Sequence, residues 1–176
     1  MSTTAGSASN VPNGLSGIWR LDPGRSSVEF HVRHFYGLMT VKGRFERYEG
    51  TLTLGPQPAV ALTIDAVSLD TKMTKRDQHL RSADFFDVAN HPQVRFVSET
   101  ATLDGETLRV RGELHAAGQH VPLELDATVR PVDGELEVEA TTDVDQRSLG
   151  MTWSPLGITR APSTLTVRGR LVRVEG

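Results

Sequence analysis

Most of the chain alternates between apolar and polar residues, which is the pattern of half-buried β-strands. In residues 26–35, Val28, Phe30 and Val32 share one face, and the residues between them are charged or polar. Similar runs predict further strands over residues 17–22, 38–54, 59–69, 92–103, 107–117, 120–132, 135–144 and 163–174. These nine runs, of which residues 17–22 form only a short strand, indicate an all-β protein of about eight strands.

The sequences between these runs predict tight antiparallel hairpins. Asp104-Gly105 and Asp133-Gly134 stand between alternating runs, and a further turn is expected near Gly118. Some strands contain an internal glycine, which is typical of a bend in a curling sheet; these are Gly43, Gly112 and Gly169. Long, bent, sequentially paired strands favour an up-and-down antiparallel eight-stranded barrel, with a sandwich as the alternative.

One segment, Asp70–Asp87, breaks the strand pattern after the fourth predicted strand. Its spacing predicts a short helical insertion over Lys75–Arg81, with Thr74 as the helix cap. The adjacent aromatics Phe85 and Phe86 follow this helix. We expect one of the two rings to plug the barrel mouth and the other to pack outside. The charges of the segment are expected to hold it in place by capping and ion pairing, which we favour over acid–base catalysis.

The 176 residues suit one domain, which we place at residues 17–176 after a flexible tail at residues 1–16. The net charge of −3 and pI near 6.1 argue against a nucleic-acid partner. No apolar run is long enough for a transmembrane segment. The sequence contains no cysteine, which rules out disulfides, thiolate nucleophiles and cysteine-based zinc sites but does not fix the compartment. The N-terminus shows no secretory signal pattern, so we expect a cytoplasmic protein.

The predicted barrel interior is almost entirely apolar. A packed core and an apolar tunnel for a chain-like lipid need the same inward residues, so periodicity leaves both open, although it favours the packed core. The metal hypothesis is weak. His31 and His34 project to opposite strand faces. His115 and His120 flank a turn and could approach each other, but no third ligand is evident nearby.

The chain resembles the YceI-like family from about Trp19 to Val174. The resemblance rests on Trp19–His34, Val41–Leu52 and, most specifically, on Leu69–Ser98, which carries the R-D-x-H-L and D-F-F-D pattern of the family. Further matching segments are Arg111–Gly118, with Val121–Leu125, and Arg147–Met151. The family consists of lipocalin-like barrels associated with polyisoprenoid lipids. The resemblance therefore favours a ligand tunnel over a packed core.

This resemblance implies a lipid-binding protein that is not an enzyme and that needs no cofactor. It would store or transport an elongated isoprenoid lipid, such as a polyprenyl phosphate or isoprenoid quinone, or another long-chain lipid. An enzyme acting on a small lipid-like substrate is the alternative, and the resemblance also suggests homodimers. We predict that the apolar tunnel is lined by Phe30, Val32, Phe45, Leu52, Leu62, Ile64, Leu80, Phe85, Phe86, Phe96, Leu114, Leu123, Leu125, Met151 and Trp153.

The candidates for contact with a polar ligand head group are His34, Arg81 and Arg147. Donors of this kind suit a pyrophosphate or a carbonyl oxygen. Taken one at a time, each of these residues is expected to form a structural hydrogen bond or salt bridge rather than a contact with the ligand head group. We predict no catalytic residue and no metal site.

Overall fold

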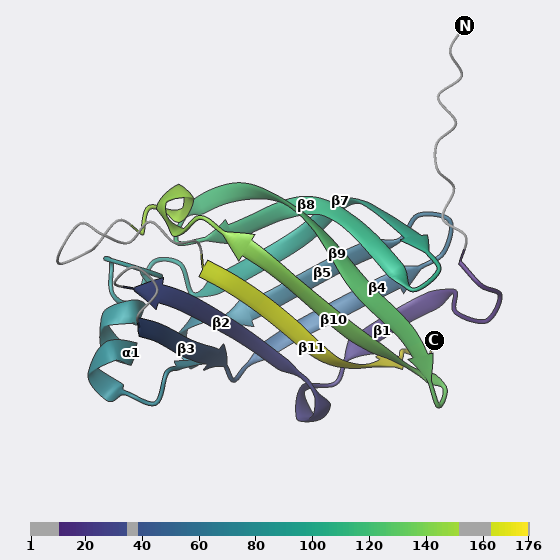
Figure 1. Cartoon of the computed structure of the whole chain (residues 1–176), viewed down its shortest axis with the longest axis horizontal. Coiled ribbons are helices and arrows are strands. Elements are labelled where there is room, and N and C mark those ends of the chain that lie inside the picture. The colour runs from purple at the N-terminus through teal and green to yellow at the C-terminus, as the bar shows by residue number, and fades with distance from the viewer. Residues whose placement is uncertain (1–10, 35–38, 152–162, 176) are drawn as a thin grey trace, which may run out of the picture.

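The computed structural model describes residues 11–34, 39–151 and 163–175, and these form a barrel of antiparallel strands (Figure 1). The strands are β1 (Gly17–Leu21), β2 (Ser27–His34), β3 (Met39–Phe45), β4 (Tyr48–Leu54), β5 (Ala59–Asp65), β6 (Leu69–Asp70), β7 (Gln93–Asp104), β8 (Thr107–Ala116), β9 (Gln119–Val132), β10 (Glu135–Val144) and β11 (Ser163–Arg173). The described residues also include the helix α1 (Thr74–Arg81) and the 3₁₀ turns η1 (Pro23–Arg25), η3 (Ala66–Ser68) and η4 (Gln146–Leu149).

The barrel closes because β1 pairs with strands on both of its sides. Strands β4, β5, β7, β8, β9, β10 and β11 pair in that order, and β1 joins β4 to the C-terminal part of β11. The N-terminal part of β11 pairs instead with β2, which continues the wall beyond β1. The all-β, eight-stranded, up-and-down barrel predicted from the sequence is thus confirmed, and its helix follows the fourth predicted strand.

The predicted long strand at residues 38–54 is two strands. The chain bends at Glu46 and Arg47, where it passes from the pairing of β3 with β2 and β6 to the pairing of β4 with β1 and β5. Gly43 was predicted to mark a bend in the sheet, but in the structure it makes room for a neighbouring aromatic ring. It lies opposite Phe30, and a Cβ at Gly43 would lie 2.3 Å from Cζ of the Phe30 ring. The missing side chain lets that ring lie against β3.

The hairpin turns follow the predicted chemistry with one shift. The pairs Ala117-Gly118 and Asp133-Gly134 both adopt positive φ angles, which type I′ hairpin turns require. The turn between β7 and β8 lies at Gly105-Glu106, one residue later than predicted, because Asp104 pairs with Thr107.

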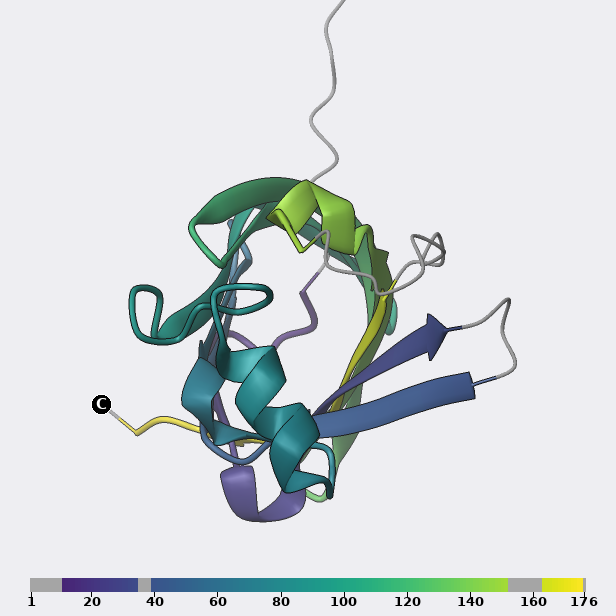
Figure 2. The same cartoon turned by 90° about the vertical axis from the view of Figure 1, so that its left-hand side faces the viewer.

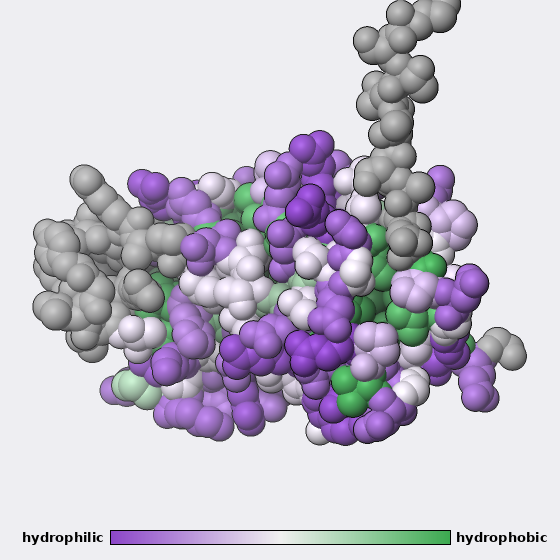
Figure 3. Space-filling view, turned by 45° about the vertical axis from the view of Figure 1, so that its right-hand side comes forward, coloured by the Kyte–Doolittle hydropathy of each residue, from purple (hydrophilic) through white to green (hydrophobic). Residues whose placement is uncertain are grey.

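The two ends of the barrel differ. The end farthest from α1, which we call the packed end, holds several of the least exposed side chains, Trp19, Leu54, Leu103 and Leu136. At the other end, the α1 end, the helix lies over the lower part of the barrel opening in the view of Figure 2. The outer face seen in Figure 3 is mostly hydrophilic or neutral, with apolar residues in small patches. The apolar residues are therefore concentrated inside the barrel.

The described part of the predicted tail, residues 11–16, contacts the barrel. Val11 and Leu15 pack against the core, and Trp19 Nε1 donates a hydrogen bond to the Leu15 carbonyl at 3.0 Å. Arg173 donates to the carbonyl of Ser16 at 2.6 Å, and its guanidinium lies 4.4 Å from the centre of the Trp19 ring. In the part of the chain that the structure describes, no helix has the length and apolar character needed to cross a membrane.

Candidate functional site

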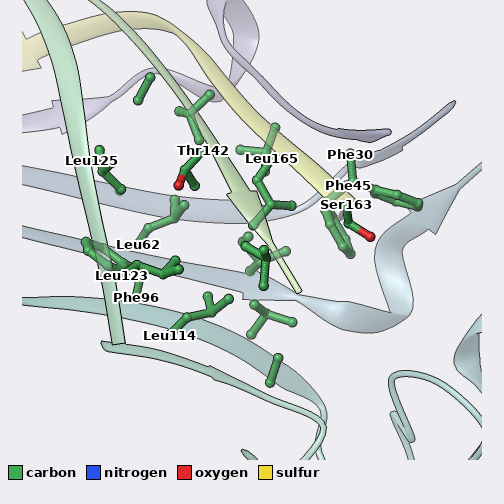
Figure 4. A pocket seen from close by; sticks show the side chains of 18 of the residues that line it. Phe30, Phe45, Leu62, Phe96, Leu114, Leu123, Leu125, Thr142, Ser163 and Leu165 are labelled. Atoms are coloured by element: carbon green, nitrogen blue, oxygen red, sulfur yellow. The ribbon is translucent and has the colours of Figure 1, made fainter. Parts of the chain in front are cut away.

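The barrel contains a cavity of about 320 Å³ with an apolar lining. Side chains from opposite walls point toward one another across this space, with Leu62 and Phe96 on one side and Leu165 on the other (Figure 4). The lining follows from strand geometry, because every second residue of a strand points inward. Each wall of the barrel contributes such residues, so the cavity is enclosed mainly by carbon atoms.

The predicted tunnel residues that belong to the described part of the chain all line this cavity. They are Phe30, Val32, Phe45, Leu52, Leu62, Ile64, Leu80, Phe85, Phe86, Phe96, Leu114, Leu123, Leu125 and Met151. Trp153, the remaining predicted residue, lies outside the described residues. The structure thus brings these side chains around one space, and their contact with a ligand stays a prediction.

Phe85 and Phe86 both line the cavity, unlike the expected arrangement with one ring outside. Phe86 packs edge-on against Phe45, at 5.8 Å between ring centres, and lies 6.4 Å from the Phe30 ring. Phe85 contacts the His79 ring of α1, at 5.1 Å. Both rings can face inward because the chain after α1 turns tightly, with the Phe86 amide bonded to the Leu80 carbonyl. The alternation of an extended strand does not apply there.

The helix α1 is anchored by a buried carboxylate. Asp77, which is 7% exposed, accepts hydrogen bonds from the Thr71 amide at 2.9 Å and from the Thr71 hydroxyl at 2.5 Å. Arg76 donates to the carbonyl and the hydroxyl oxygen of the same Thr71, at 2.6 and 2.8 Å. The predicted cap at Thr74 is wrong, because Met73 holds the cap position and makes no side-chain hydrogen bond there. Side-chain bonds to the segment before the helix replace a cap.

The three predicted head-group residues are not brought together in the lining. Arg81 donates to the carbonyls of Val67 and Leu69, at 3.0 and 2.9 Å, and so ties α1 to the preceding turn. Arg147 is exposed and pairs with Asp145 at 3.1 Å; this hydrogen bond lowers the pKa of the Asp145 carboxyl. His34 ends β2, opposite Met39. The contacts of Arg81 and Arg147 are those of structural residues.

Polar lining residues that the sequence analysis did not select lie near the α1 end. Thr142, near the end of β10, points its hydroxyl into the cavity, and Ser163 begins β11 (Figure 4). The Ser163 hydroxyl lies 3.3 Å from Oε1 of Gln146, which is 9% exposed and also lines the cavity. Thr142 could have been found, because it has the inward phase of Val138 and Ala140. Ser163 could have been found in the same way, because it has the inward phase of Leu165 and Val167 on β11. Gln146 carries no comparable signal, because it lies in the 3₁₀ turn η4.

The fold and its interior define a lipocalin-like barrel with an apolar internal cavity. The chain belongs to the family of YceI-like domains, whose model matches residues 19–173.

Individual relatives agree with this family and fold. Protein YceI of Escherichia coli O6:H1 is 39% identical over 104 residues, which is 57% of this chain and 54% of that protein. The match thus spans about half the length of the curated relative. The crystal structure of Burkholderia cenocepacia BcnA superimposes with a TM-score of 0.78 at 17% identity, covering 86% of this chain and 99% of that one.

A second solved structure is a polyisoprenoid-binding domain from Saccharophagus degradans, implicated in plant cell wall breakdown. It has a TM-score of 0.71 at 14% identity and covers 89% of this chain and 98% of that one. At such low identity, both solved structures show the shared fold alone.

Proposed function

We propose that this protein binds an elongated apolar lipid of the polyisoprenoid type in the barrel cavity, without catalysing a reaction on it. The observation that carries the proposal is the apolar lining, to which each wall of the barrel contributes. The YceI-like family and the polyisoprenoid-binding neighbour from Saccharophagus degradans agree with a lipid ligand. Such a protein would store or transport its ligand.

The apolar lining offers enough driving force for this role. Burying one methylene group is worth about 0.8 kcal/mol, so a chain of several isoprene units gains far more than one good hydrogen bond would give. Part of this gain offsets the freedom lost on association. The lining contacts carbon chains without directional bonds, so we expect weak discrimination between chains of similar length.

The ligand orientation we favour places the polar head at the α1 end. Thr142, Gln146 and Ser163 lie there and offer hydroxyl and amide groups to a carbonyl or phosphate oxygen. The packed end offers a polar head no comparable place, because Trp19 and Leu136 fill it. A polyprenyl phosphate or an isoprenoid quinone has the required shape, with one polar end and a long apolar tail.

The first test is mass spectrometry of an organic extract from protein purified without detergent. We expect isoprenoid or other long-chain lipid in stoichiometric amount, and an extract without lipid from gently handled protein contradicts the proposal. The enzymatic alternative predicts instead that an added lipid-like substrate is chemically changed on incubation. Cytoplasmic location and homodimer formation stay predictions.

The second test fills the cavity. Ala140 lines it from β10, and an indole in Ala140→Trp would occupy space needed by the lipid chain. Losing the burial of two methylenes, about 1.6 kcal/mol, weakens binding of a fluorescent isoprenoid phosphate by about tenfold. Glu139→Trp is the matched control, because Glu139 precedes Ala140 on β10 and is exposed on the outer face. Equal affinity of the two variants would count against the cavity as the binding site.

A further inference from the structure

Outside the cavity, three potential metal ligands converge on the outer face of the β8–β9 hairpin. His115 Nε2 lies 2.8 Å from Oε1 of Glu113, and His120 Nδ1 lies 3.2 Å from the same oxygen. The two imidazole rings face each other with 4.0 Å between their centres. One donor atom from each of the three residues lies within 4.8 Å of the other two. The third ligand that the sequence analysis did not find near the two histidines is therefore Glu113.

The hairpin geometry explains why these side chains meet. The turn at Ala117-Gly118 fixes the register in which His115 lies directly opposite His120. This pair is one step beyond the pair that closes a two-residue turn, a position where opposite side chains approach most closely. Glu113 is two residues before His115 on β8 and therefore points to the same face. The backbone thus holds the three groups together before any ion binds.

We propose that Glu113, His115 and His120 form a binding site for a divalent cation of the Zn²⁺ type. Two imidazoles and one carboxylate are a known zinc ligand set, with bonds of about 2.0–2.2 Å. In a tetrahedral site, such bonds place neighbouring ligand atoms about 3.3 Å apart. The two distances at Glu113 are 2.8 and 3.2 Å, so small side-chain rotations admit the ion.

The surroundings decide what kind of site this is. The His120 side chain is 60% exposed, so the remaining coordination positions of an ion face solvent and water can fill them. Arg95 is the register partner of His115 on β7 and is exposed. Its charge opposes a cation, although solvent screens the effect. We therefore expect an open three-ligand site that binds more weakly than a closed structural zinc site.

The test is calorimetric titration of the whole, chelator-treated chain with ZnCl₂. We expect one Zn²⁺ per chain. Glu113→Gln and His120→Ala should each weaken binding by at least about tenfold, because even loss of a group that only supports a ligand costs that much. His31→Ala is the control; His31 lies on β2, away from this hairpin, and its loss should leave the affinity unchanged.

NMR of the imidazole nitrogens in the unaltered protein gives a second measurement that needs no variant. Addition of Zn²⁺ should shift the ring resonances of His115 and His120 and leave those of His31 in place. The proposal is overturned if Zn²⁺ binds equally to the unaltered chain and the His120→Ala variant, or if the two ring signals do not respond. Neither result bears on lipid binding, because these residues do not line the cavity.

Discussion

The two ends of the barrel are built from the same alternating sequence but are filled in opposite ways. At the packed end, Trp19 and Leu136 are almost fully buried, and Arg173 covers the Trp19 ring. At the α1 end, inward residues such as Val32 and Leu123 stay partly accessible and line the cavity. The barrel thus contains both closely packed side chains, at the packed end, and an apolar cavity that reaches the α1 end. That a lipid occupies this cavity stays a proposal.

This difference has a physical cause. The packed end holds large side chains that are almost fully buried and do not line the cavity, namely Trp19, Leu54, Leu103 and Leu136. The α1 end is covered by a helix whose polar contacts with Thr71 and with backbone carbonyls hold it over the barrel. Because these hydrogen bonds hold α1 in place, its side chains do not need to fill the cavity below it. We therefore expect a large side chain at the packed end to contribute more to stability than one in the cavity wall, and we place the candidate binding function toward the α1 end.

The largest expected effect tests this division directly. Leu136→Ala at the packed end should cost about 2–5 kcal/mol, because it opens a cavity in close-packed surroundings. Leu123→Ala in the cavity wall should cost less, roughly 1–2 kcal/mol, because part of that side chain already lacks contacts. Urea denaturation of both lipid-free variants measures the difference. Equal costs would mean that the α1 end is packed as tightly as the other end.

The anchor of α1 gives the next largest effect. Asp77→Ala leaves the amide and hydroxyl of Thr71 without their buried acceptor, at about 1–3 kcal/mol for each group. Hydrogen exchange should accelerate mainly in residues 71–88, since the packed end does not depend on this contact. Asp84→Ala is the control, because its pair with His79 is largely exposed and contributes little. If hydrogen exchange accelerated evenly over the whole barrel, α1 would not be anchored independently of the rest of the fold.

A third effect concerns the close contact of β3 with Phe30. In Gly43→Ala the new Cβ must displace the Phe30 ring, which should cost about 1–3 kcal/mol. The displaced ring also changes the cavity wall next to Phe86. Gly55→Ala is the matched control, because a Cβ there meets no atom within 4 Å. Thermal denaturation should separate the two variants, and similar melting temperatures would show that Phe30 can move freely.

Most strands could be predicted from sequence because inward and outward residues alternate along them. The break at Glu46 and Arg47 could not, since it depends on which neighbours β3 and β4 pair with. The lining residues that lie on strands followed from strand phase, as the position of Leu62 shows. The hydrogen bonds of Arg81 could not be predicted from strand phase, because tertiary packing decides which backbone carbonyls lie within its reach. For the same reason, the convergence of Glu113 on His115 and His120 became visible only in three dimensions.

The smallest expected effect is electrostatic and belongs to the packed end. Arg25 forms a 2.8 Å salt bridge with Asp22 and another with Glu135, which joins η1 to the start of β10. These hydrogen bonds lower the pKa values of both carboxyls below the ordinary value of about 4. The resulting stability is present above that value and is lost as the pH falls through the lowered pKa values.

Arg25→Gln should therefore destabilise the protein slightly at pH 7 and less at pH 2, because the two carboxyls lose their charge as the pH falls through their lowered pKa values. Lys72→Gln at the α1 end is the comparison, because the Lys72 side chain is 74% exposed and, among the described residues, pairs with Asp70 alone. We expect a smaller loss there, since one flexible lysine orders fewer groups than an arginine bonded to two carboxylates. Denaturant titrations of both variants at the two pH values measure these differences. A loss for Arg25→Gln that is as large at pH 2 as at pH 7 would assign its effect to packing of the side chain rather than to its charge.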